Sequence, residues 1–296
     1  MLIIDAHSHL WLSQDAEVGG GRVRTLDGDN RSRSEFFGEV RQMLPPFMID
    51  GRNTAEVFIS NMDYAQVAAA VVVQELIDGN QNAYLAEVAA RYPSRLFCMG
   101  MASTPEEVDE LHARNFKGVA IAGHRIDYPL TRLLPMLRRM EELGMVLSLC
   151  LHEDNHQLPE VEDIVRECPG LKIAIGHFGM VTTSGWMGQV RLARHPNVMI
   201  ETGGITWLFN DEFYPYPSAM KAIRTAADEV GIDKLMWGYD YPRTITAITY
   251  RMSYDFITRS PMLNDEEKRL LLGENARRFY GFSELLELPY IKNMSE

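Results

Sequence analysis

The sequence predicts an α/β fold, a single (β/α)8 barrel, and three observations support this prediction. The chain has 296 residues, and barrels of ~250 residues commonly form one domain. Eight short apolar runs alternate with longer helical patterns, which is typical of parallel β/α units. The phosphate-binding turns GxGxxG and GxxxxGK are absent from the sequence, which disfavours a doubly wound nucleotide-binding sheet.

The predicted strands are short runs rich in apolar and β-branched residues. Residues 68–73, Ala-Ala-Ala-Val-Val-Val, are apolar without interruption, as expected of a strand that is covered on both faces. After the first gap, successive runs begin roughly 20 to 40 residues apart, which leaves room for a helix and two loops. The eight predicted strands are residues 2–6, 67–73, 95–101, 118–122, 146–151, 172–176, 198–201 and 234–238.

The segments between these runs carry signals for the start and end of helices. Thr104 followed by Pro105 is typical of an N-cap and a first helical position. Gly144 follows the helical pattern of residues 133–143, where a left-handed C-terminal glycine is expected.

The long gap after the first strand, residues 12–53, is predicted to be an inserted loop or lid. It follows the first strand, so in a barrel it emerges at the face where active sites lie. Two interpretations remain open: a solvated surface insertion, or a lid or subunit contact whose arginines meet an anionic substrate. Its arginines are Arg22, Arg24, Arg31, Arg33 and Arg41. At the other end, residues 264–296 are predicted to form a C-terminal helical tail.

A pair of histidines, His7 and His9, ends the first predicted strand. Side chains two residues apart on a strand point to the same side, so both imidazoles can bind one metal ion. Three further residues stand at the ends of predicted strands: His152 after the fifth, His177 after the sixth and Asp240 after the eighth. A barrel gathers these ends in one ring, and such ligands suit a hydrolytic Zn²⁺ site.

Each of these residues also has a simpler interpretation. Alone, His152 is explained as a hydrogen-bonded polar residue, and Asp240 as a helix cap before Pro242. Arg125 and Arg243 are candidate anchors for a substrate carboxylate, or merely surface or ion-paired arginines. His124, directly after the fourth strand, is a further candidate substrate-binding residue. The coincidence of all the strand ends at one face favours the metal site.

The quoted residues resemble the metal motifs of the amidohydrolase superfamily. More narrowly, they are similar to its amidohydrolase-2 group, which includes aminocarboxymuconate-semialdehyde decarboxylase, aromatic-acid decarboxylases and sugar-acid or pyrone lactonases. The resemblance covers residues 4–282 apart from the insertion. It rests on His7-Ser8-His9, His152, Ile175-Gly-His177-Phe-Gly, Gly238-Tyr-Asp240-Tyr-Pro242 and residues 272–281.

The resemblance implies a role for each matching position. The metal ligands would be His7, His9, His152 and Asp240, and His177 would orient the catalytic water. Asp240 would also move the proton, so Asp240 and His177 are the expected catalytic residues. No lysine stands at the end of the fourth strand, where two-metal members place a bridge. We therefore expect one divalent metal ion, with Zn²⁺ as the expected ion.

Composition limits the partners and the compartment. A net charge of −12 argues against a nucleic-acid partner, and no apolar stretch approaches the ~18 residues of a membrane span. No secretory signal is visible, and the three cysteines form no CxxC pair, so we expect a cytoplasmic protein. The expected partner is a small carboxylate-bearing substrate, and a homo-oligomer is expected only by analogy.

Three functions are compatible with the sequence. The first is a metal-dependent hydrolase that acts on a lactone or other cyclic carboxylic derivative. The second is a metal-dependent non-oxidative decarboxylase, a lyase, of an aromatic or unsaturated carboxylic acid. These two share every ligand, so product analysis must separate them. The third is a non-catalytic barrel that serves as a binding protein, which predicts no stoichiometric metal.

Overall fold

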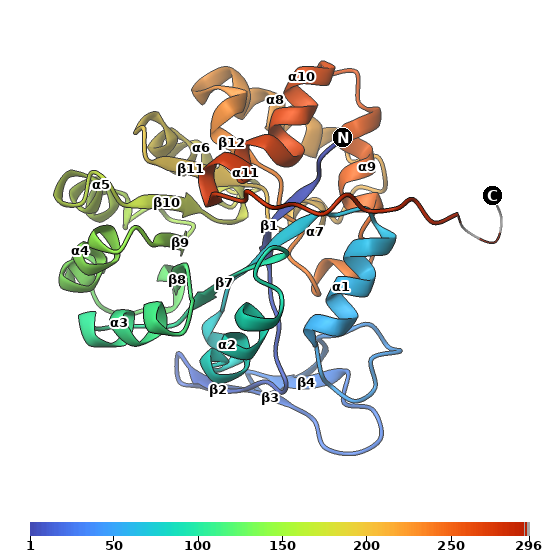
Figure 1. The fold of residues 1–296 in the computed structure, drawn as a ribbon, viewed down its shortest axis with the longest axis horizontal. Coiled ribbons are helices and arrows are strands. Elements are labelled where there is room, and N and C mark those ends of the chain that lie inside the picture. Colours follow the sequence, from blue (N-terminus) through green and yellow to red (C-terminus); the bar gives the residue numbers. More distant parts are fainter. Residues whose placement is uncertain (293, 295–296) are drawn as a thin grey trace.

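Eight parallel strands form the centre of the protein in the computed structural model, which describes residues 1–292 and 294 (Figure 1). Neighbouring strands follow the order of the sequence, which is the topology of a β/α barrel and confirms the predicted fold class. The strands are β1 (Ile4–Ser8), β6 (Ala69–Val72), β7 (Leu96–Gly100), β8 (Gly118–Ala122), β9 (Val146–Cys150), β10 (Lys172–Ile175), β11 (Val198–Glu201) and β12 (Leu235–Met236).

The last strand returns to the first and so brings distant residues together. The backbone N–H of Ala6 donates to the carbonyl oxygen of Trp237 at 2.9 Å, and the N–H of Asp240 donates to the carbonyl oxygen of His7 at 2.8 Å. Both bonds involve the residues just after β12, where the chain no longer pairs with β11 and runs beside β1 instead. As a result, Asp240 lies directly beside the histidine pair.

Helices surround the strands (Figure 1). The predicted start at Thr104 is confirmed, because its side chain accepts a hydrogen bond from the N–H of Glu107 and Pro105 begins α3. Gly144 has a φ of 66° just after α4, in the left-handed region predicted for it. The helices are α1 (Ala55–Tyr64), α2 (Asn82–Arg91), α3 (Pro105–Ala113), α4 (Leu134–Glu142), α5 (Leu158–Glu167), α6 (Trp186–Arg191), α7 (Ile205–Leu208), α8 (Pro217–Val230), α9 (Met252–Arg259), α10 (Asp265–Arg269) and α11 (Asn275–Tyr280).

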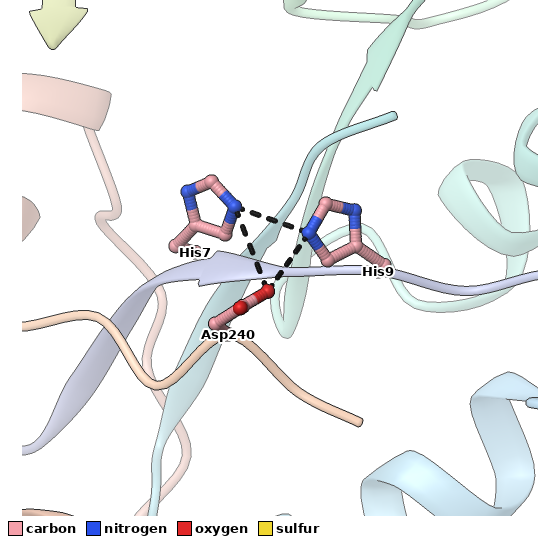
Figure 2. Close-up of side chains that lie close together, drawn as sticks. All are labelled: His7, His9 and Asp240. Carbon is pink, nitrogen blue, oxygen red and sulfur yellow. Dashed lines mark hydrogen bonds and ion pairs between the residues drawn. The ribbon is translucent and has the colours of Figure 1, made fainter. Parts of the chain in front are cut away.

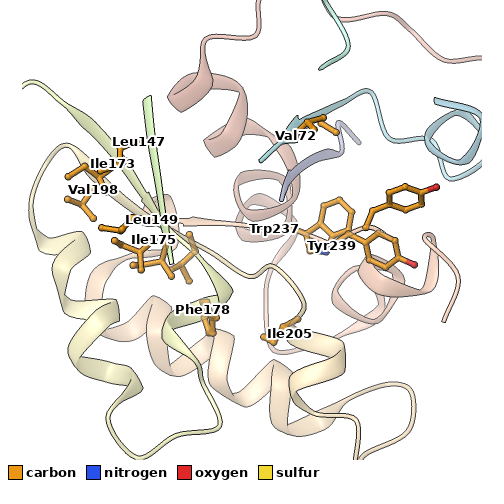
Figure 3. Close-up of a cluster of buried hydrophobic side chains, with 14 of the residues drawn as sticks. Val72, Leu147, Leu149, Ile173, Ile175, Phe178, Val198, Ile205, Trp237 and Tyr239 are labelled. Carbon is orange, nitrogen blue, oxygen red and sulfur yellow. The ribbon is translucent and has the colours of Figure 1, made fainter. Parts of the chain in front are cut away.

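The hydrophobic core lies on both faces of the strands. In β6, Ala69 and Val71 belong to one buried cluster, whereas Ala70 and Val72 belong to another. The second cluster also contains Leu147 of β9 and other side chains drawn in Figure 3. Alternate residues of one strand are thus buried on opposite sides, which explains why the run is apolar at every position.

The insertion is a small antiparallel sheet, where the sequence indicated a loop or lid. Its ends are joined, since Trp11 and Asn53 exchange two backbone hydrogen bonds of 3.1 and 2.9 Å. Val23 and Met43 of the insertion pack on Ile77 of the barrel. Its strands are β2 (Asp15–Val18), β3 (Gly21–Thr25), β4 (Arg33–Phe36) and β5 (Glu39–Gln42), in that order.

The C-terminal segment is helical over only part of the predicted range. Helical turns extend from Asp265 to Tyr280, and Gly281, at a φ of 77°, ends α11. Residues 282–292 contain no helix, and the side chain of Gln66 donates to the carbonyl oxygen of Pro289 within this stretch at 3.1 Å. Residues 293, 295 and 296 lie outside the described part. Within the described part, no helix has the length and apolar character needed to cross a membrane.

Candidate metal centre

Two imidazoles and a carboxylate meet at the end of the barrel where β1 and the chain after β12 run side by side (Figure 2). Nε2 of His7 lies 3.1 Å from Nε2 of His9, and Oδ1 of Asp240 lies 3.1 Å from Nε2 of His9. The third side of this triangle, from Nε2 of His7 to Oδ1 of Asp240, is 3.9 Å. All three side chains are at most 2% exposed.

The size of this triangle fits the ligands of one zinc ion. Tetrahedral Zn²⁺, with bonds of about 2.0–2.1 Å to nitrogen, separates its ligand atoms by about 3.3 Å. Burial lowers the pKa of both His7 and His9 to about 4, so both rings are neutral at pH 7 and retain a lone pair for a metal. The residues present therefore fit a single divalent ion.

Asp240 is held in an unusual backbone conformation. Its φ of 64° is in the left-handed region, which non-glycine residues rarely adopt. Burial raises the pKa of its carboxyl, but the hydrogen bond to His9 and the charge of Arg243 outweigh burial and bring the pKa well below its usual range. Its Oδ2 accepts a hydrogen bond of 2.7 Å from the indole Nε1 of Trp207. Asp240 is therefore an ionised carboxylate in a fixed orientation.

Glu201, at the end of β11, orients His7, a role that the sequence alone does not predict. Its Oε1 lies 2.8 Å from Nδ1 of His7 and accepts the backbone N–H of His177 at 3.0 Å. Its Oε2 accepts the backbone N–H of Gly203. A proton on Nδ1 leaves Nε2 of His7 free to bind a metal, which is the arrangement that metal-binding histidines ordinarily have. The position of Glu201 at the end of a barrel strand is the feature of the sequence that could have identified it as a site residue.

Replacing Glu201 with glutamine is expected to weaken metal binding roughly 10- to 100-fold, the usual cost of losing an outer partner of a ligating histidine. The amide group presents one acceptor oxygen where the carboxylate presents two, so the bond to His7 or that to Gly203 is lost. Competition with a chromophoric chelator measures the affinity. Glu162→Gln, in the half-exposed His195–Glu162 pair, is the matched control. Equal zinc affinity in Glu201→Gln and the unmodified protein would contradict this role.

Asp78 lies behind His9 and connects the insertion to the metal centre. Its Oδ2 is 3.4 Å from Nδ1 of His9, and both of its oxygens accept hydrogen bonds from Arg243, at 3.1 and 3.2 Å. Gln14, just before β2, donates to Oδ1 of Asp78 at 2.7 Å and accepts a hydrogen bond from Ser34. The insertion therefore supports the second histidine through a buried polar chain.

His177 stands beside the triangle. Its ring centroid is 4.7 Å from that of His7, and its Nδ1 lies 3.0 Å from the carbonyl oxygen of Gly203. A carbonyl only accepts, so Nδ1 carries the proton and Nε2 remains an acceptor. Burial lowers the pKa of His177, which keeps the ring neutral.

A cavity of about 510 Å³ opens next to these residues. Its walls include His9, His177 and Asp240 of the centre and Trp207 of α7, while Phe36, Arg41, Gln42 and Met43 come from the insertion. The insertion therefore forms one wall of the cavity. This volume falls within the range of small-molecule sites.

The structure places every predicted site residue except His7 in the wall of this cavity but does not add His152 to the triangle. His152 lines the cavity, yet its side chain is 42% exposed and its Nδ1 lies 3.0 Å from Oδ1 of Asp154. The fourth ligand predicted at this position therefore remains a prediction.

The predicted substrate anchors His124, Arg125 and Arg243 also line the cavity. Both arginines already have acidic partners: Nε of Arg125 lies 2.9 Å from both oxygens of Glu75, and Arg243 contacts Asp78 and Asp240. Burial and the neighbouring Arg125 lower the pKa of His124 to about 3. His124 is therefore neutral at the cavity wall.

The chain belongs to an amidohydrolase family, since residues 4–282 match the Amidohydro_2 family model. This confirms the resemblance drawn from the motifs and makes the protein an amidohydrolase-family enzyme. The L-fucono-1,5-lactonase of Burkholderia ambifaria is 28% identical over 261 residues, which cover 81% of this chain and 80% of that protein.

Solved structures share the fold over almost their whole length. A probable 2-pyrone-4,6-dicarboxylic acid hydrolase from Acinetobacter baumannii, with citric acid bound, has a TM-score of 0.69 and 21% identity, covering 95% of this chain and 100% of that one. An amidohydrolase from Burkholderia multivorans with bound zinc has a TM-score of 0.70 and 17% identity, covering 95% and 99%. At these sequence identities, the similarity establishes a shared fold and nothing more.

Proposed function

We propose that this protein is a metal-dependent hydrolase that opens a lactone or another cyclic carboxylic derivative. The observation that carries the proposal is the buried triangle of His7, His9 and Asp240 beside a cavity of about 510 Å³. The lactonase relative and the dicarboxylic acid hydrolase with the same fold support this chemistry over a pure binding role.

One divalent ion, Zn²⁺ in our proposal, is held by His7, His9 and Asp240, and His152 remains the candidate fourth ligand. When bound, such an ion lowers the pKa of water to near neutrality, which makes a strong nucleophile available at pH 7, and it polarises a carbonyl group. Glu201 keeps the ligand nitrogen of His7 unprotonated. The zinc-bearing amidohydrolase of the same fold supports this choice of metal.

Asp240 and His177 are proposed to move and orient the water. Asp240 is ionised, and its Oδ2 is held by Trp207, so it can accept a proton from water and return it to the leaving oxygen. His177 presents Nε2 as a neutral acceptor and can align the water. His124, Arg125 and Arg243 are proposed to bind the acidic or polar groups of the substrate.

Assays of the zinc-loaded protein with a panel of sugar lactones, pyrone carboxylates and aromatic acids test this function. We expect acid release, followed with a pH indicator, from at least one lactone, and a ring-opened acid of unchanged carbon number by mass spectrometry. Release of CO₂ from an aromatic acid, with no lactone opened, would show that the protein is a decarboxylase and not a hydrolase. Protein that binds no zinc and opens no lactone would instead be a non-catalytic barrel.

A further inference from the structure

Arg41 of β5 brings a positive charge from the insertion into the wall of the cavity. In the pairing of β4 with β5, Arg41 lies opposite Ser34, so both side chains are on one face of the small sheet. Ser34 is buried, and its hydroxyl donates to Gln14 at 2.8 Å, which in turn donates to Asp78 of the barrel. Phe36, two residues after Ser34 on the same face, also lines the cavity. The face that carries Arg41 is therefore the face that meets the barrel.

The guanidinium of Arg41 is positioned by its neighbours in this hairpin. Its Cζ lies 4.5 Å from the ring centroid of Phe36, which is within the range of a cation–π contact. The turn between the two strands, Phe37-Gly38, has φ values of 52° and 86°, as expected of a tight two-residue hairpin loop. The N–H of Phe37 donates to the carbonyl oxygen of Arg22 on β3 at 2.9 Å. A packed sheet, and not a free loop, thus presents Arg41 to the cavity.

Two other arginines of the wall already have buried counter-charges. Nε of Arg125 lies 2.9 Å from both oxygens of Glu75, which is buried. Arg243 contacts Asp78 and Asp240, both at most 2% exposed. Separating such pairs would leave a carboxylate without its partner and out of water, which is costly. These two arginines can donate hydrogen bonds to a ligand, but their charges are already balanced.

Arg41 has an acidic partner that can be released into water. Its Nη2 lies 3.0 Å from Oε2 of Glu39, and the two side chains are 53% and 69% exposed. An exposed pair of this kind contributes little, because water solvates both charges. A carboxylate of a bound molecule can therefore take the place of Glu39 and accept two parallel hydrogen bonds from the guanidinium. Glu153, in the same wall, is exposed, so its repulsion of an anion is screened.

We propose that Arg41 binds a carboxylate of the substrate that takes no part in the reaction. This contact selects acidic substrates over neutral ones of the same size. The inference rests on the proposed function, in which the reacting carbonyl group lies at the buried triangle. The substrate class is then a lactone, or a related cyclic derivative, that carries a free carboxylate in addition to the ester bond that is broken. Glu39 competes with this carboxylate for Arg41.

Titration calorimetry of the zinc-loaded full chain with matched acids tests this assignment without requiring turnover. The pairs are glucarate against gluconate and isophthalate against benzoate, in which the first acid has one additional carboxylate. We expect the unmodified protein to bind the diacid of at least one pair more tightly. Arg41→Gln should lose roughly 10-fold in affinity for that diacid, the size of a hydrogen bond to a charged group, and bind the monoacid almost as before. Arg41→Lys keeps the charge without the planar fork and should retain part of the preference.

Glu39→Gln distinguishes substrate recognition from a structural role of the Arg41–Glu39 pair. If Arg41 binds the carboxylate, Glu39→Gln removes a competitor and should raise the affinity for the diacid, whereas Arg41→Gln lowers it. Loss of a merely structural pair would instead shift the affinity in the same direction in both variants. Arg22→Gln is the matched control, because it breaks a similarly exposed pair with Asp15 outside the described cavity wall and should bind both acids normally.

Turnover provides a second readout that separates this inference from the proposed function. With a glucarate lactone that keeps a free carboxylate, Arg41→Gln should raise KM and leave kcat almost unchanged, and a gluconate lactone should show neither effect. Equal affinity of the unmodified protein for diacid and monoacid in both pairs would overturn the inference, even if lactones are opened. So would the same shift in Arg41→Gln and Glu39→Gln. Opposite shifts in a protein that opens no lactone would support the acid-binding role of Arg41 and contradict the proposed function.

Discussion

Replacing His9 with alanine is expected to abolish retention of the buried metal ion and, with it, turnover. Nε2 of His9 lies 3.1 Å from each of the two other atoms of the triangle, so its loss leaves one imidazole and one carboxylate. The loss of affinity should exceed the roughly 10- to 100-fold effect of removing an outer partner such as Glu201. Elemental analysis after gel filtration in metal-free buffer measures the metal that each variant retains.

Two controls separate loss of a ligand from loss of the fold. His112→Ala removes an exposed imidazole from α3 and should leave the metal content unchanged. His9→Gln preserves much of the buried volume, so its metal-free form should melt close to the unmodified protein. Normal retention of the buried ion by both His7→Ala and His9→Ala would remove these residues from the metal site.

The strands of the barrel could be predicted because their burial on two faces leaves a direct mark on the sequence. The strands over residues 118–122 and 198–201 coincide with β8 and β11. Residues 234–238 were predicted as the last strand, whereas β12 covers only Leu235 and Met236, because the following residues turn to pair with β1. The strands of the insertion bury only a few scattered apolar residues, such as Val23, and so show no regular apolar alternation from which its sheet could be predicted.

The site was predictable where geometry follows from position along a strand. His7 and His9 face one side because strand side chains alternate, and Asp240 reaches them because barrel strands end in one ring. The partners behind them could not be predicted: Glu201 and Asp78 act through side-chain contacts between segments distant in sequence. For His152, the sequence predicts its place at the strand end but not its ring orientation, which Asp154 influences.

Replacing Asp240 with asparagine is expected to reduce kcat by roughly 10²- to 10⁴-fold at saturating zinc, the usual contribution of a general acid or base. Asparagine keeps the size of the side chain but removes the charge and the proton acceptor. The melting temperature should stay close to that of the unmodified protein. Steady-state kinetics with a lactone from the panel that the unmodified protein opens, across a zinc titration, measures kcat at full occupancy and so corrects for weaker metal binding.

A neutral residue at position 240 also changes the local charge, and Asp78→Asn controls for that effect. Asp78 is equally buried and pairs with the same Arg243, but it contacts His9 through Nδ1, on the side away from the ligand nitrogen. If Asp240 acts by transferring the proton, Asp78→Asn should lose far less kcat than Asp240→Asn. Equal losses would mean that charge near Arg243, and not proton transfer at Asp240, limits the rate, and full activity in Asp240→Asn would exclude Asp240 from the chemistry.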